Sequence, residues 1–173
     1  MSATDLTAAL ATVEQDHRLV LDKMQALKEA VSRLLDADGD DPRPALGRLR
    51  DLNKFFVTQF GNHLEEEEIT LFPLLERYEG RELVARLRQE HTDMWRRLED
   101  FNNCLDIATQ LEAPPAAVRR DLVMYGWEFL ELMDNHAHVE TQAIGRCLAR
   151  SLAEPRGSAS RGQTAALTAP DTR

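Results

Sequence analysis

Apolar residues recur every three or four positions along most of the chain, where they form four long segments. This spacing is typical of an α-helix with one buried face. No segment alternates between apolar and polar residues with a period of two, so no β-strand is expected. The first segment runs from about Thr4 to Leu35, the second from Pro42 to Glu79, the third from Leu83 to shortly before Ala113, and the fourth from Val118 to about Leu152.

Short breaks rich in Gly, Pro and Asp separate the four segments. Asp41 and Pro42 predict the start of the second helix, with an acidic cap followed by a proline in the first turn. Gly80 predicts its end. Pro73 lies inside the same segment, and it should kink or end the helix because proline has no backbone N–H to donate.

Four amphipathic helices with short connections predict an all-α fold, an up-down-up-down antiparallel four-helix bundle over residues 1–153. Residues 154–173 are rich in Ser, Ala, Thr, Pro and Gly. A segment of this composition buries little apolar surface, so we expect a disordered tail there.

Six polar residues interrupt the apolar faces at positions that should point into the bundle. Burying a charged group without a partner is costly, so each of these residues needs one. A metal ion could serve several of them at once. They are His17 in the first helix, His63 and Glu67 in the second, His91 in the third, and His136 and Glu140 in the fourth.

The positions of the four histidines along their helices test this idea. Counted from the connection between the first and second helices or between the third and fourth, each lies 18 to 21 residues away. At about 1.5 Å rise per residue, the four imidazoles fall within roughly one helical turn of a common plane. Each glutamate follows a histidine by four residues, which places both on one helix face. The spare histidine, His138, is rotated about 200° from His136 and should point elsewhere.

Less specific explanations exist for each residue taken alone. A single histidine on an apolar face is more often a hydrogen-bonded core residue than a ligand, and polar pairs four residues apart are common on solvated faces. Glu65, Glu66 and Glu68 are expected to form such a solvated acidic face. The joint arrangement of four histidines and two glutamates on four helices nevertheless favours a metal site.

The donor types restrict the metal. Zinc prefers four ligands, often sulfur, and calcium and magnesium prefer oxygen alone. Imidazole with carboxylate suits iron or manganese. Two carboxylates from different helices can bridge two ions, and two histidines and a solvent-derived bridge would then give each ion about five ligands. We expect one open position on each ion, and our working assignment pairs the histidines of the first and second helices and those of the third and fourth.

The second helix also carries a motif, His63-Leu-Glu-Glu-Glu67-Glu68-Ile-Thr-Leu71-Phe72-Pro73, that resembles the helix motif of hemerythrin-like (HHE cation-binding) domains. Asp16-His17, Glu90-His91 and His136-Ala-His-Val-Glu140 resemble the family's other signatures. Oxygen-carrying hemerythrins have a further histidine one turn beyond the ligand of the third helix, and Trp95 stands there in this chain. The ligand set is therefore similar to the branch with four His and two Glu.

The resemblance implies two non-haem iron ions bridged by carboxylates and an oxo or hydroxo group. It implies a role in oxygen, peroxide or nitric oxide chemistry or in a stress response, with a diatomic molecule or peroxide as the ligand. The alternative is a non-catalytic protein that binds O2 or NO or that senses iron or oxygen. A metal-free helical interaction module is the third hypothesis. Trp95 could pack in the core or shape an open metal position beside His91.

Composition narrows the remaining classes. The net charge of −9 argues against nucleic-acid binding, which requires clustered Lys and Arg. No apolar run is long enough for a membrane span, and the N-terminus does not resemble a signal peptide, so a cytoplasmic location is expected. Cys104 and Cys147 should lie on the order of 35 Å apart in antiparallel helices, too far for a disulfide. We expect two core-filling thiols.

Overall fold

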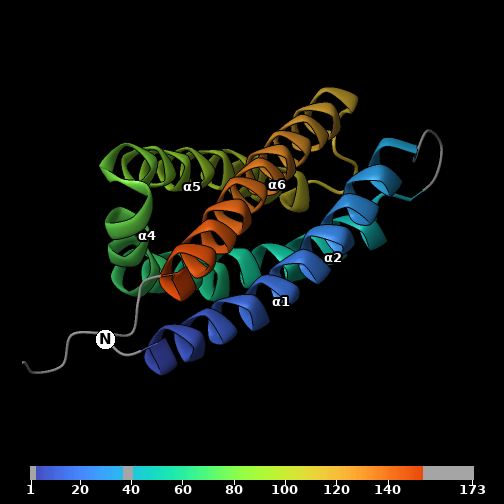
Figure 1. Cartoon of the computed structure of the whole chain (residues 1–173). Helices are drawn as coiled ribbons and strands as arrows, with labels where there is room; N and C mark the ends of the chain where they lie inside the picture. Colours follow the sequence, from blue (N-terminus) through green and yellow to red (C-terminus); the bar gives the residue numbers. More distant parts are fainter. Residues whose placement is uncertain (1–2, 37–40, 154–173) are drawn as a thin grey trace, which may run out of the picture.

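The computed structural model describes residues 3–36 and 41–153, with side chains in the first helix from His17 onward (Figure 1). Within these residues every regular element is helical, and no strand is present. The predicted connecting residues at 37–40 and the predicted tail at 154–173 lie outside the described residues.

Four long helical segments form the bundle. The first is α1 (Ala3–Asp36). The second is continuous from residue 43 to 79 and comprises α2 (Arg43–Phe55), η1 (Phe56–Phe60), α3 (Gly61–Glu66), η2 (Glu67–Leu71) and α4 (Phe72–Glu79). The third and fourth are α5 (Arg81–Gln110) and α6 (Ala116–Ala153).

Each long segment packs on two neighbours: α1 on α2 and α6, and α5 on α2 and α6. Because short connections reverse the chain between neighbours, this order confirms the up-down-up-down bundle. The predicted helix ends are also observed. The backbone N–H of Arg43 donates to the Asp41 carboxylate at 3.0 Å, and Gly80 takes a φ of 97°, which favours glycine.

The second segment bends near Pro73, as its sequence predicts, and α4 stands at an angle to the helices before it in Figure 1. The turn before the proline is a π-helix, in which the N–H of Phe72 donates to the carbonyl of Glu67. A proline cannot donate to the carbonyl four residues earlier and its ring crowds that group, so a wider turn relieves the contact. Glu67 is the first residue of this π turn.

The described side chains form two apolar clusters in the interior. The larger is built from α1, α2, η1, α3, α5 and α6, with Phe56, Phe101 and Phe129 completely buried. The smaller joins η2, α4, α5 and the end of α6 around Phe72 and Leu75. On η2, α5 and α6, the positions between the two clusters carry buried polar side chains, so a polar layer separates the clusters.

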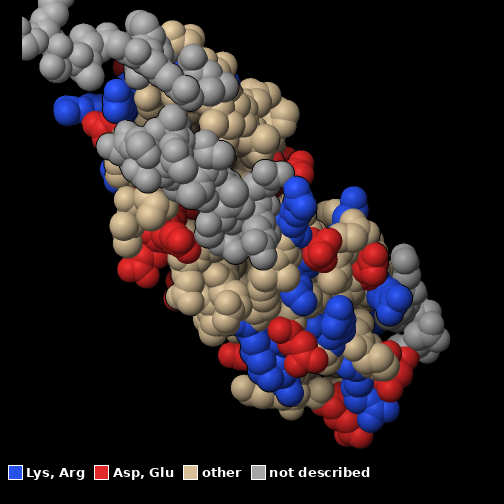
Figure 2. Space-filling view, turned by 60° about the horizontal axis from the view of Figure 1, so that its bottom comes forward, with Lys and Arg blue, Asp and Glu red and all other residues tan. Residues whose placement is uncertain are grey.

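The two cysteines are free and buried, Cys104 in the larger cluster and Cys147 in the smaller one. This confirms the prediction of two core-filling thiols without a disulfide. On the face shown in Figure 2, acidic and basic side chains intermingle over the described surface, without one continuous area of either sign. None of the described helices combines the length and apolar character that crossing a membrane requires.

Candidate metal centre

The polar layer contains all six residues that the sequence singled out. Glu67, His91, His136 and Glu140 are buried, and Glu140 is completely inaccessible. The side chains of His63 and His17 are 9% and 16% exposed. The six residues come from all four long segments, so the predicted agreement in level along the bundle is observed.

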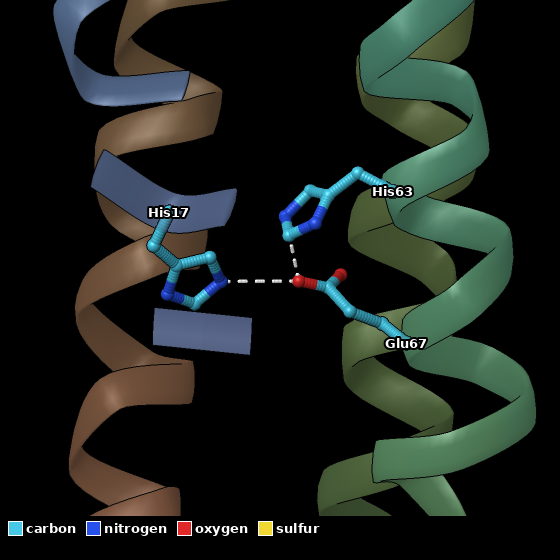
Figure 3. Close-up of side chains that lie close together, drawn as sticks. All are labelled: His17, His63 and Glu67. Carbon is cyan, nitrogen blue, oxygen red and sulfur yellow. Dashed lines mark hydrogen bonds and ion pairs between the residues drawn. The ribbon is translucent and has the colours of Figure 1, made fainter. Parts of the chain in front are cut away.

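One group of donors lies between α1 and the second segment. Oε1 of Glu67 is 3.1 Å from Nε2 of His17 and 2.8 Å from Nε2 of His63 (Figure 3). Both imidazoles point at the same carboxylate oxygen from opposite helices. Nε2 of His17 also lies 3.0 Å from Oε2 of Glu140. The three residues His17, His63 and Glu67 are close enough to share one metal ion.

A second group uses the other oxygen of the same carboxylate. Oε2 of Glu67 is 3.4 Å from Nε2 of His91 and 3.9 Å from Nε2 of His136. Glu67, His91 and His136 are also close enough to hold one ion. Glu67 therefore belongs to both groups. The histidines lie in two pairs, His17 with His63 and His91 with His136, which are the pairs of our working assignment. Oε2 of Glu140 lies 3.9 Å from Nε2 of His136, so this carboxylate too stands between the groups.

Two further carboxylates, from Glu68 and Glu90, hold the imidazoles of the second group from outside. Nδ1 of His91 donates to Glu68 and Nδ1 of His136 donates to Glu90, each at 3.0 Å. A carboxylate only accepts, so each ring carries a hydrogen on Nδ1, and Nε2 is the ring atom that faces the centre and is left to bind an ion. Arg88 and Arg86 in turn donate to Glu68 and Glu90.

The Glu68 contact corrects the sequence analysis, which assigned this residue to a solvated face. Glu68 is 38% exposed and reaches across to α5. Its signal is weak in the sequence because it sits one residue beyond the inward-facing Glu67. The role of Glu90 was also missed, although it adjoins His91 in the chain and lies one turn before Met94.

The electrostatics of the layer favour a cation at its middle. Nε2 of His91 and Nε2 of His136 are only 3.3 Å apart, and two lone pairs at that distance repel unless a proton or a metal ion lies between them. Among the described groups, neither oxygen of Glu140 and not Oε2 of Glu67 accepts a hydrogen bond of good geometry, although Nε2 of His17 lies 3.0 Å from Oε2 of Glu140. Buried carboxylate oxygens without partners are costly, and a metal ion would satisfy them. The residues therefore fit a metal.

The pKa values describe the same attraction for positive charge. Burial alone would lower the pKa of His17, but the carboxylates of Glu140 and Glu67 outweigh it and raise this pKa to about 10. The pKa of His136 is also raised, because contacts with Glu67, Glu140 and Glu90 outweigh burial. For Glu67, burial acts to raise the pKa, but the surrounding histidines lower it well below its usual value. Without metal, protons compensate the buried carboxylates.

A comparison with protein-family models matches residues 8–148 to the hemerythrin HHE cation-binding domain. The chain belongs to this hemerythrin family. The match spans all four long segments and all six polar residues of the layer. No curated protein and no solved structure matches the chain. The family is one of cation-binding domains, and the buried His and Glu cluster of this hemerythrin domain has the donors to hold a metal.

Trp95 does not lie where the sequence analysis placed it. Its side chain is 40% exposed and its ring packs against the backbone at Gly61, on the outside of this hemerythrin domain. The idea that Trp95 shapes an open position beside His91 is therefore wrong. The prediction for His138 is confirmed, because this residue is exposed and pairs with Gln142 at 2.8 Å.

A cavity gives access to the centre on a side of the bundle away from Trp95. This cavity, of about 260 Å³, opens between α1, α3, α5 and α6, and it is lined by His17, His63 and His136. Leu21 and Thr141, which also line it, are exposed. His91 does not line this cavity. A small molecule that enters it would reach both donor groups of the hemerythrin centre.

Proposed function

We propose that this hemerythrin domain holds two non-haem iron ions and acts in oxygen, peroxide or nitric oxide chemistry. His17 and His63 bind one ion, and His91 and His136 bind the other. Glu67 would bridge the two, and Glu140 would provide the second bridge. The observation that carries the proposal is the carboxylate of Glu67, whose two oxygens serve two separate pairs of histidines.

The donor set favours iron or manganese over zinc, calcium and magnesium. It consists of imidazole nitrogen and carboxylate oxygen, and both cysteines lie in the apolar clusters away from it. Such a mixed set suits iron or manganese. Two nitrogens and two shared carboxylate oxygens give each ion fewer ligands than the six of an octahedral site. Iron ions held in this way would bind and exchange electrons with O2, hydrogen peroxide or nitric oxide.

The protein's own part is to position the donors and to limit access by water. Glu68 and Glu90 hold a hydrogen on Nδ1 of His91 and of His136, so that Nε2 of each ring is the atom directed at the ion. The buried carboxylates supply two negative charges that offset part of the charge of the ions. The cavity admits small molecules from one side, while the apolar clusters close the layer above and below.

A specific observation favours the alternative of a non-catalytic carrier or sensor. Among the described residues that line the cavity, only Arg18 and Thr141 are polar besides the three histidines. Neither is a general acid or base at neutral pH, so proton delivery to a bound substrate would depend on the ligands themselves. A protein that only binds O2 or NO needs no such group.

Anaerobic loading with Fe(II) tests the proposal. The expected result is two irons per chain and an optical spectrum that changes on exposure to O2, hydrogen peroxide or NO. Catalytic loss of hydrogen peroxide or NO, measured with an electrode, would support the enzyme, whereas reversible spectral changes without turnover would support the carrier or sensor. A chain that binds fewer than two irons, or whose spectrum ignores all three molecules, would contradict the proposal.

A further inference from the structure

The cavity beside the metal centre is much larger than a diatomic molecule requires. A cavity needs roughly 10 to 15 Å³ to hold a single water molecule, and an apolar cavity of about 150 Å³ accommodates benzene. The cavity here measures about 260 Å³. It therefore has room for a small organic molecule in contact with the imidazoles.

Apart from the three histidines, Arg18 and Thr141, the walls of the cavity are apolar. They are formed by Val20, Met24, Phe60, Leu64, Met94 and Met133, all of which are buried. Three of these six side chains are thioethers, which are flexible and polarisable and adapt to occupants of different shape. Aromatic rings in particular make favourable contacts with sulfur.

The chemistry of the walls also selects the charge of the occupant. A charged molecule would lose its hydration among the apolar side chains without gaining a partner for its charge along most of the wall. A cation would in addition meet the guanidinium of Arg18, which lines the cavity. An uncharged apolar molecule meets neither penalty.

We propose that this cavity binds one small uncharged apolar organic molecule, the size of a substituted benzene ring, directly against the metal centre. The inference deepens the proposed function and rests on it, because the occupant would lie beside imidazoles from both metal positions. His17 and His63 belong to one position and His136 to the other. The occupant would exclude water from the side on which small oxidants enter.

Methyl NMR of the full chain with ¹³C-labelled methionine tests the inference, with benzene as the probe. The chain is loaded with Zn(II), which is diamagnetic, and titrated in parallel without metal. The methyl signals of Met24, Met94 and Met133 are expected to shift and saturate together. Met124 is an internal control, because it is 43% exposed and does not line the cavity. Shifts that fail to saturate, or that affect Met124 equally, would overturn the inference.

A cavity-filling variant adds a second test. Ala137 lines the cavity, so Ala137→Leu should weaken benzene binding about tenfold or more. The matched control is Ala149→Leu, an exposed position on the same helix, which should leave the affinity unchanged. Thr141→Trp, at another residue of the lining, serves if Ala137→Leu does not fold. Unchanged affinity in the folded filling variant would show that benzene binds elsewhere.

The metal content separates this inference from the proposed function. If the chain binds benzene in the cavity but never holds two irons, the proposed function fails and the cavity remains a binding site. If the chain holds two irons that respond to O2 but the methionine signals ignore benzene, only the inference about the cavity fails.

Discussion

Replacing His17 by glutamine should change the number of protons that the centre releases when it binds metal. In the metal-free protein the pKa of His17 is raised to about 10 by the neighbouring carboxylates of Glu140 and Glu67. An imidazolium cannot bind a metal, so the proton must leave when an ion enters. Glutamine has no such proton.

The magnitude follows from this pKa. At pH 8, a group with a pKa of about 10 is roughly 99% protonated, whereas a histidine with an ordinary pKa is only about 3% protonated. His17 should therefore contribute close to one proton per chain at this pH, and His136, whose pKa is also raised, should add to it. As the pH is raised towards the pKa of about 10, the apparent metal affinity should increase about tenfold per pH unit for each proton that binding releases.

Anaerobic calorimetry with Fe(II), repeated in two buffers of different protonation enthalpy, counts the released protons. We expect one to two protons per chain for the unaltered protein at pH 8, and about one fewer for His17→Gln. The matched control is His138→Gln, because His138 is exposed and lies outside the centre. Release of less than about half a proton by the unaltered protein, or equal release by His17→Gln, would refute the reasoning.

The same proton stabilises the metal-free fold, and the sign can be stated. Because the folded-state pKa of His17 lies above its ordinary value of 6.5, its contribution is complete below pH 6.5 and is lost as the pH rises towards 10. Glu67 has a lowered pKa, so its contribution is present above pH 4.5 and is lost on acidification. Thermal melting in EDTA should therefore show lower stability at pH 10 than at pH 6.5.

Three further predictions concern other residues. Glu67→Ala should abolish binding of the coupled pair of irons, as measured by iron per chain, and a variant that keeps two tightly bound irons would contradict the bridging role. Glu90→Gln should weaken metal binding about 10- to 100-fold in competition titrations, because an outer carboxylate orients its histidine, and an unchanged affinity would show that the contact only packs. Gly126→Ala should lower the free energy of unfolding by about 1 to 3 kcal/mol, since a Cβ there would lie 2.8 Å from Val31. In denaturant titrations the control Gly47→Ala, which meets nothing within 4 Å, should not be destabilised.

The fold and the inner donors were predictable because both depend on position along regular helices. The buried residues of α5 mostly repeat in steps of three and four and include His91. A histidine on such a seam must point inward whatever its neighbours do. The distance of each histidine from its connecting turn placed the four histidines at one level, and the spacing of four residues placed the glutamates beside them.

The error at Trp95 has a physical reason in the same helix. The buried face of α5 continues from His91 through Met94 and Leu98, and each helical turn contributes only one or two buried residues to it. Trp95 follows His91 by four residues but lies beside this face, at its edge, and its ring turns out over Gly61. The spacing from His91 gives the approximate direction of the Trp95 side chain. Whether that side chain is buried depends on how wide the buried face of the helix is.

The outer carboxylates could not be predicted from spacing at all. Glu68 reaches His91 and Glu90 reaches His136 across the gap between two helices. Such contacts depend on how far each helix is rotated and shifted against its neighbour, which periodicity within one helix does not report. The π turn at Glu67 changes the rotation of its own helix locally, and only the proline after it hints at that change.

The division of the interior into two clusters has a consequence for cooperativity. Among the described side chains, the two clusters have no member in common, a layer of charged groups lies between them, and the smaller cluster contains fewer buried side chains. Proteins open in contiguous cooperative units, and units joined by weak contacts open separately. Native-state hydrogen exchange should therefore show α4 and the end of α6 opening as a unit of their own in the metal-free chain. Ions bound by residues from every long segment would link this unit to the rest, so that both exchange in a single global event.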